Sequence, residues 1–243
     1  MALILYRIYQ VLIMLPLAFV ATLLASLITI CGCLLGGSRI FSYYPAHIWA
    51  KICCWLSLVK VTVNGRENID KNTSYVFVAN HQGAYDIFAI YGFLNHNFKW
   101  MMKIGLMKIP MVGYACKCAG QIFVDNSSQS AVRRTMEAAE RQLSRGMSVV
   151  VFPEGSRTLD GKMHAFKRGA YQLAMEFNLP VTPITIDGAY EIMRRRGPKL
   201  PHWGHITLTI HKPIHAPEDG HELKSLMAES FDAIHSALPE CHK

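Results

Sequence analysis

Residues 75–86 read YVFVANHQGAYD, and this stretch gives the clearest indication of the fold. It opens with the apolar residues 75–79, which are typical of a short buried β-strand. The polar run 80–83 follows directly, and from Asp86 to Leu94 the pattern favours a helix. The stretch therefore predicts a buried strand that ends in a polar loop at the rim of a sheet.

Strands and helices alternate in the same way along the following residues. Further strands are predicted at 58–63, 100–102, 120–124, 148–152, 181–186 and 206–211. Helices are predicted at 130–145, 168–178 and 220–238, and a loop at 109–113, where Pro110 and Gly113 stand. This alternation is typical of βαβ units. The predicted fold class is α/β, with a mainly parallel sheet flanked by helices and functional residues in the loops after its strands.

The N-terminal part has the composition of a membrane segment. No charged residue occurs from position 8 to position 38. As one helix this run would be ~46 Å long, against ~30 Å of membrane hydrocarbon. A kink or break is expected at Pro16 or in the glycine-containing region 32–37. The second apolar stretch, 41–59, also holds Trp, Tyr, His and Lys, and is interpreted as an amphipathic helix at the membrane interface.

We therefore expect residues 1–58 to form N-terminal membrane-anchoring helices and residues 59–243 to form one globular domain. Whether the helices span the bilayer or enter a single leaflet stays open at this point. A cleaved signal peptide is disfavoured, because the apolar run is longer than usual and no clear small-x-small site follows it.

Charge and cysteine content narrow the choice of partners. The formal net charge is +8, which favours anionic partners. Nucleic acid is disfavoured, because zinc-finger spacing, an RNA-binding signature and a basic helix with heptads are all missing from the sequence. Together with the membrane segment, the positive charge favours anionic lipid. The seven cysteines have no metal-ligand spacing and are interpreted as small apolar residues in a reducing compartment.

The first candidate pair for chemistry is His81 and Asp86. Residues five positions apart do not share a face of a regular helix, so the two can meet only if His81 folds back over the helix start. Gly83 makes this bend easy. Asp86 would then accept a hydrogen bond from one imidazole nitrogen and leave the other free as a general base. Taken alone, such a pair more often means a capping aspartate near an ordinary surface histidine.

The second candidate site is the stretch 152–158, FPEGSRT, which follows a predicted strand. Arg157 can bind a phosphate with two hydrogen bonds, and Gly155 permits a close backbone approach. Taken alone, a turn with a surface salt bridge is the simpler interpretation. Lys167 and Arg168 stand at a helix start, where a nearby anion and a solvated basic turn are equally good interpretations. The other basic residues that could reach an anion, although a solvated surface is the default for each, are Lys99, Lys103, Lys108 and Arg194–Arg196. A covalent acyl-serine route is disfavoured, because no G-x-S-x-G motif occurs.

Four blocks in this order make the chain resemble the glycerolipid acyltransferase superfamily, most closely the bacterial 1-acyl-sn-glycerol-3-phosphate acyltransferases. Asn80-His81-x4-Asp86 is similar to the catalytic block of that family. The other three blocks are 120–125 (GQIFVD), 152–158 (FPEGSRT) and 181–184 (VTPI). The resemblance extends over about residues 59–214, and an N-terminal membrane anchor is also usual for the family. One block alone would not be specific, whereas four ordered blocks are.

The resemblance implies a reaction and a role for each residue. His81 would take a proton from the acceptor hydroxyl, with Asp86 orienting it, and the oxygen would attack the thioester of acyl-CoA or acyl-carrier protein. The acceptor would be 1-acyl-sn-glycerol-3-phosphate (lysophosphatidic acid) and the product phosphatidic acid, with no metal and no other cofactor. Arg157 would hold the acceptor phosphate. The remaining candidates for substrate binding are Glu154, Gly155, Ser156, Lys103 and Arg168.

Two departures from the family pattern leave the acceptor open. The family often has Ser where this chain has Gly83, and often Arg where it has Asn126. Another lysophospholipid or a lyso-aminolipid is therefore an alternative acceptor. A non-catalytic lipid-binding protein and a hydrolase that uses His81 on water are alternatives of other classes. The expected location is the inner membrane, with the catalytic domain 59–243 facing the cytoplasm, where activated acyl donors are found.

Overall fold

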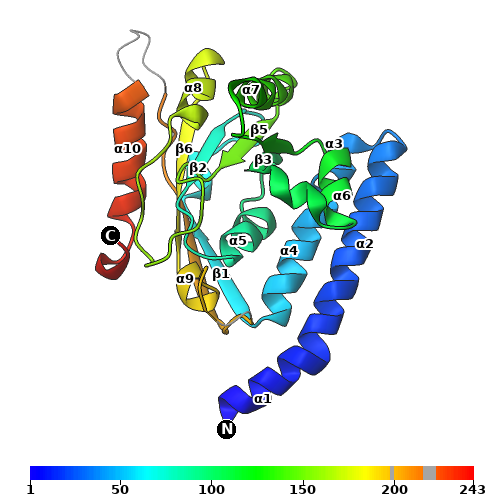
Figure 1. Ribbon diagram of the computed structural model, residues 1–243. Helices are drawn as coiled ribbons and strands as arrows, with labels where there is room; N and C mark the ends of the chain where they lie inside the picture. The colour runs from blue at the N-terminus through cyan, green and yellow to red at the C-terminus, as the bar shows by residue number, and fades with distance from the viewer. Residues whose placement is uncertain (198–199, 216–222) are drawn as a thin grey trace.

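A seven-stranded sheet forms the centre of the computed structural model, which describes residues 1–197, 200–215 and 223–243 (Figure 1). The strands lie in the order β1-β7-β6-β2-β5-β3-β4. All neighbouring strands are parallel except β6 and β7, so the predicted α/β class with a mainly parallel sheet is confirmed. The strand bounds are β1 Val59–Asn64, β2 Val76–Ala79, β3 Phe98–Lys103, β4 Ile122–Val124, β5 Ser148–Val151, β6 Val181–Asp187 and β7 Gly204–Ile210.

Helices cover both faces of the sheet. One face carries α4 (Tyr44–Leu56) and α5 (Tyr85–Phe93), and the other carries α7 (Gln129–Leu143), α8 (Gly169–Glu176) and α10 (Leu223–Ser236). Strand β2 contributes to both cores, because Phe77 faces the first helix layer while Val76 and Val78 face the second. A strand buried on both faces explains why residues 75–79 show no alternation of polar and apolar side chains.

Most predicted elements are confirmed, and the loop expected at 109–113 is wrong in part. Residues 112–118 form α6 (Val112–Cys118), preceded by a 3-10 turn at 104–108. Gly113 lies inside this helix because its backbone packs on Met107, whose carbonyl oxygen would be 2.2 Å from a Cβ at position 113. Two short helices, α3 (Ser38–Phe41) and α9 (Ala189–Ile192), were not predicted. Residues 220–222 of the predicted helix 220–238 lie outside the described residues.

The N-terminal helix runs from Ala2 to Leu34 and is long and apolar enough to cross a membrane. It consists of α1 (Ala2–Tyr9), a π-helical turn at 10–14 and α2 (Leu15–Leu34). The expected irregularity near Pro16 therefore takes the form of a wider turn just before the proline, which lacks an N–H to donate. The helix ends at Leu34, inside the region 32–37 where a kink or break was expected, and Gly36 follows with a φ of 89° in the left-handed region.

The N-terminal helices are tied to the rest of the chain by specific contacts. Helix α4 places Ala50 and Cys54 in the first core and leaves Trp55 exposed, as expected of an amphipathic helix. The ammonium group of Lys99 is buried and donates to Ser42 Oγ at 2.7 Å, and burial lowers the pKa of this side chain to about 8. The domain boundary at residue 58 stays a prediction. Helix α4 lies before this boundary, yet its side chains help to form the hydrophobic core that covers the sheet.

The first helix is also held to the segment that precedes β7. The Arg7 guanidinium donates to the carbonyl oxygen of Pro201 at 3.2 Å, and the Gln10 side-chain amide donates to the same oxygen at 2.8 Å. The ring of Tyr6 meets that of Trp203 edge to face. Helix α1 therefore contacts the chain immediately after the basic run 194–196.

Candidate active site

His81 and Asp86 lie in direct contact at the carboxyl end of β2. His81 Nδ1 is 2.7 Å from Asp86 Oδ2, although the residues are five positions apart. The loop folds back because the same carboxylate oxygen also accepts the backbone N–H groups of Gln82, at 2.8 Å, and Gly83, at 2.9 Å. The predicted pairing is confirmed.

The Asp86 carboxylate lies at the start of a helix. It is fully buried and lies in the first turn of α5, where the positive end of the helix favours a negative charge. With the carboxylate as acceptor, the Nδ1 atom of His81 carries the hydrogen, and Nε2 is left as the basic nitrogen. The His81 side chain is 13% exposed, so the site remains accessible from outside.

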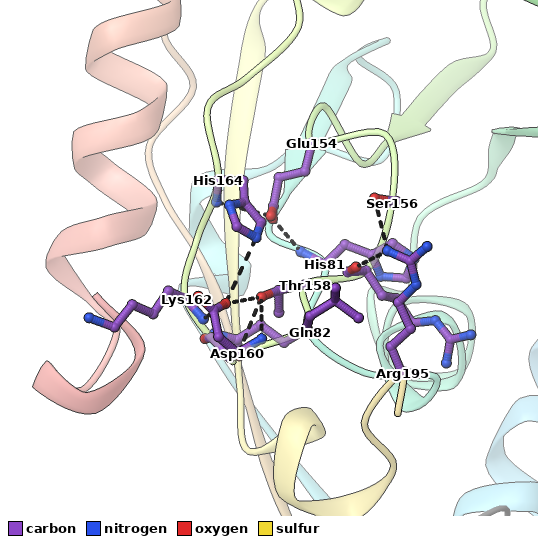
Figure 2. Close-up of polar contacts among 12 residues, drawn as sticks. His81, Gln82, Glu154, Ser156, Thr158, Asp160, Lys162, His164 and Arg195 are labelled. Atoms are coloured by element: carbon purple, nitrogen blue, oxygen red, sulfur yellow. Dashed lines mark hydrogen bonds and ion pairs between the residues drawn. The ribbon is translucent and has the colours of Figure 1, made fainter. Parts of the chain in front are cut away.

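Glu154 fixes the backbone around His81. Its Oε1 accepts the backbone N–H of His81 at 2.7 Å and its Oε2 accepts that of His164 at 3.1 Å (Figure 2). Burial raises the pKa of this carboxyl to about 7. Both oxygens are thus engaged by the protein, and the geometry gives Glu154 a role in shaping the loop. Its predicted contact with substrate stays a prediction.

The His81 ring is also held from the side of the next strand. It stacks on the Phe152 ring with centroids 3.9 Å apart and an angle of 6° between the planes. The backbone N–H of Thr158 donates to the His81 carbonyl oxygen at 2.9 Å. Because β5 lies beside β2 in the sheet, the segment after β5 and the segment after β2 form one site.

Residues 154–158, which we call the anion loop, lie within the predicted binding stretch 152–158. Gly155 adopts a φ of 77°, which only glycine takes up easily. The Lys167 ammonium lies over it, and a Cβ at position 155 would be 2.5 Å from Lys167 Nζ. Arg157 and Ser156 are half-buried in the same loop. Lys167, which the sequence analysis named among the residues that could reach an anion, therefore contacts this loop.

Two predicted binding residues lie farther from the histidine. Lys103 is exposed at the carboxyl end of β3, which β5 separates from β2. Arg168 is exposed directly before α8. In the part of the chain that the structure describes, neither side chain contacts the His81–Asp86 pair, so their binding roles stay predictions.

Arg195 lies at this site, although the sequence analysis did not place it beside His81. Its Nη1 donates to the Arg157 carbonyl oxygen at 3.0 Å and lies 3.5 Å from Ser156 Oγ (Figure 2). The sequence shows Arg195 only as part of a basic run. The structure places Arg195 at the site because the basic run follows β6. This strand lies beside β2, on the side away from β5.

Gly83 makes a contact that bears on the family difference at this position. A Cβ at position 83 would be 2.1 Å from the carbonyl oxygen of Ala189, a backbone atom that cannot move without shifting α9. The neighbouring Ala84 N–H donates to the Met193 carbonyl oxygen at 3.0 Å. The serine that is common in the family does not fit here, because the segment after β6 occupies its place.

We therefore expect Gly83→Ser to lower both stability and activity. Overpacking of this kind typically destabilises a protein by about 1–3 kcal/mol. The measurement is the free energy of unfolding in detergent, together with the rate of acyl transfer. Gly105→Ala is the matched control, because no atom lies within 4 Å of a Cβ at that exposed position. A serine variant as stable and as active as the wild type would contradict the expectation.

The helix-covered sheet carries the His81–Asp86 pair at the end of β2, with a basic loop beside it. The acyltransferase family matches residues 60–187, and the chain belongs to this family.

The relatives that match are 1-acyl-sn-glycerol-3-phosphate acyltransferases. The chloroplastic enzyme LPAT1 of Arabidopsis thaliana is 35% identical over 202 residues, which cover 80% of this chain and 55% of the relative. The enzyme of Borreliella burgdorferi is 32% identical over 146 residues, covering 60% and 58%. The crystal structure of the 1-acyl-sn-glycerophosphate acyltransferase PlsC from Thermotoga maritima superposes with a TM-score of 0.80 at 26% identity and covers 95% of each chain. The chain spans little more than half the length of the first of these relatives.

Proposed function

We propose that this protein transfers a fatty acyl chain from an acyl thioester to the free hydroxyl of 1-acyl-sn-glycerol-3-phosphate and so forms phosphatidic acid. The observation that carries the proposal is the 2.7 Å contact between His81 and Asp86 beside a loop that Arg157, Lys167 and Arg195 make basic. Relatives with this activity match most of the chain, which supports the choice of acceptor.

The proposed reaction moves one proton and exchanges one bond. His81 Nε2 takes the proton of the acceptor hydroxyl as that oxygen attacks the thioester carbonyl carbon. A carbon–oxygen bond forms, the carbon–sulfur bond breaks, and the departing sulfur takes the proton from the imidazolium. Asp86 holds the ring orientation and stabilises its positive charge through Nδ1. The expectation that no cofactor takes part remains a prediction.

Charge at the site suits a phosphate-bearing acceptor. Arg157 offers a planar pair of donors, and the Lys167 ammonium lies over Gly155 in the same loop. We propose that these groups hold the acceptor phosphate while the hydroxyl faces His81. An acceptor without a phosphate would bind without the charge-assisted hydrogen bonds that they provide.

Membrane attachment through the helix Ala2–Leu34 follows from the lipid nature of the acceptor and the apolar surface of that helix. The exposed side chains Ile4, Leu5, Leu12 and Phe19 lie on it. We propose the inner membrane, with the catalytic domain facing the cytoplasm. Acyl-CoA and acyl-carrier protein are both anionic, and the basic surface suits either donor.

The test is acyl transfer by detergent-purified protein. Palmitoyl-CoA and palmitoyl-carrier protein are each mixed with lysophosphatidic acid, lysophosphatidylcholine or monoacylglycerol, and product and free thiol are both measured. Phosphatidic acid as the dominant product is the expected result. Product only from another lysolipid would overturn the acceptor, and thiol release without any acylated product would point to a hydrolase. Absence of both products and thiol would favour a lipid-binding protein.

A further inference from the structure

Arg195 is an exposed cation whose guanidinium is nevertheless held in one place. Its Nη1 donates to the Arg157 carbonyl oxygen at 3.0 Å and lies 3.5 Å from Ser156 Oγ, so one edge of the group is fixed to the anion loop. Among the described residues, Arg195 forms no ion pair with a carboxylate. Its positive charge is therefore not neutralised by the protein.

The segment that carries Arg195 is fixed beside the histidine loop. Gly83 and Arg194 form an antiparallel bridge, and the Ala84 N–H donates to the Met193 carbonyl oxygen at 3.0 Å. The absent side chain of Gly83 lets the Ala189 carbonyl oxygen come this close. Strand β2, which leads to His81, lies between β6 and β5 in the sheet. Arg195 comes from the segment after β6, and Arg157 comes from the segment after β5.

The carboxylates near the loop accept hydrogen bonds from groups other than this guanidinium. Both oxygens of Glu154 accept backbone N–H groups, and Asp160 Oδ1 accepts the hydroxyl of Thr158 at 2.6 Å. Two basic side chains contact the loop that contains Arg157, because Lys167 lies over Gly155 and Arg195 reaches the Arg157 carbonyl oxygen. Among the described residues, Arg157, Lys167 and Arg195 form no ion pair. Such a loop favours a bound group that carries more than one negative charge.

We propose that Arg195 binds the phosphate of the lysophospholipid acceptor together with Arg157, and thereby makes the enzyme prefer acceptors with a phosphate monoester. This inference rests on the proposed function. Arg157 approaches the phosphate from the segment after β5 and Arg195 from the segment after β6. A phosphate monoester has enough free oxygens for two guanidinium groups, whereas a phosphodiester headgroup has fewer and a neutral acceptor has none.

The experiment compares Arg195→Ala, Arg195→Gln and Arg195→Lys with the wild type in a neutral detergent. The full chain is assayed with lysophosphatidic acid and with monoacylglycerol, and KM and kcat are determined separately for acceptor and donor. We expect the alanine variant to raise KM for lysophosphatidic acid about tenfold, because a charge-assisted hydrogen bond at a half-open site is lost. The kcat, the KM for the donor and the reaction with monoacylglycerol should change little.

The two polar variants separate binding of phosphate from support of the loop. Lysine keeps the charge and should recover part of the affinity, whereas glutamine keeps only a donor for the Arg157 carbonyl oxygen and should behave like alanine. Recovery by glutamine would overturn the proposal, because it would mean that Arg195 only positions the loop. An equal loss with monoacylglycerol, or a rise only in the KM for the donor, would overturn it as well.

Arg196→Ala is the matched control, because Arg196 is the exposed neighbour and the described residues show no hydrogen bond to its side chain. Neutral detergent removes anionic lipid, so an effect of Arg195→Ala there belongs to the acceptor and not to a membrane surface. Binding of lysophosphatidic acid is measured by calorimetry in a His81→Ala background, with and without Arg195→Ala. Weaker binding supports the role of Arg195 even if wild-type turnover fails, whereas unchanged binding overturns it independently of the proposed reaction.

Discussion

Replacing His81 with alanine is expected to lower kcat for acyl transfer by about 10²–10⁴-fold, the usual effect of losing a general base. The hydroxyl of the acceptor would have no group to take its proton, while Arg157 and the anion loop would remain. The KM for lysophosphatidic acid should therefore change much less than kcat. Single-turnover rates with a palmitoyl thioester, together with calorimetric binding of the acceptor, measure the two effects separately.

His164→Ala is a suitable control for this variant. His164 is an exposed histidine next to the same loop, and its contact with Glu154 is made by its backbone N–H, which alanine retains. We expect it to keep wild-type kcat. A His81→Ala variant that transfers acyl chains at more than a tenth of the wild-type rate would exclude His81 as the general base.

Arg157→Ala is expected to have the second largest effect. It should weaken binding of the acceptor and leave the rate of the chemical step largely unchanged. Loss of a hydrogen bond to a charged group is worth about 1.5–3 kcal/mol, so KM for lysophosphatidic acid should rise roughly 10–150-fold. Monoacylglycerol, which has no phosphate, should react with this variant as it does with the wild type. The comparison of kcat/KM for the two acceptors is the measurement.

Arg141→Ala is the control for Arg157→Ala. Arg141 is an exposed arginine on α7, and replacing it with alanine removes the same charge from the chain. It should leave both acceptors unaffected. If Arg157→Ala slows both acceptors equally, the phosphate role is wrong and the residue instead supports the fold of the loop.

The sequence was sufficient to predict the parts of the site that are local. His81 and Asp86 lie within one strand–loop–helix unit, so spacing and Gly83 allowed the fold-back, and the four ordered blocks made it the preferred interpretation. The apolar run 75–79 likewise indicated a strand buried on both faces. These features depend on neighbours along the chain, and so a single sequence contains the information that determines them.

Features that depend on the order of strands in the sheet could not be predicted. Arg195 reaches Arg157 because β6, β2 and β5 lie side by side, and a single sequence does not give that order. The same holds for Gly83, whose bend was predicted but whose contact with Ala189 was not. Helix α6 was missed for a different reason. Pro110 and Gly113 are typical of a loop, yet Gly113 packs its backbone against Met107 inside a helix.

The contact between helix α1 and Pro201 has a further consequence for the proposed reaction with a lipid acceptor. Arg7 and Gln10 hold the Pro201 carbonyl oxygen, and Arg195 lies six positions earlier in the chain. Six residues reach at most ~20 Å, so Arg195 stays within about that distance of the residue that helix α1 holds. In the membrane-bound state that we propose, the anchor sets the height of the catalytic loop above the lipid surface. An acceptor can then keep its acyl chain in the bilayer while its phosphate reaches the cations.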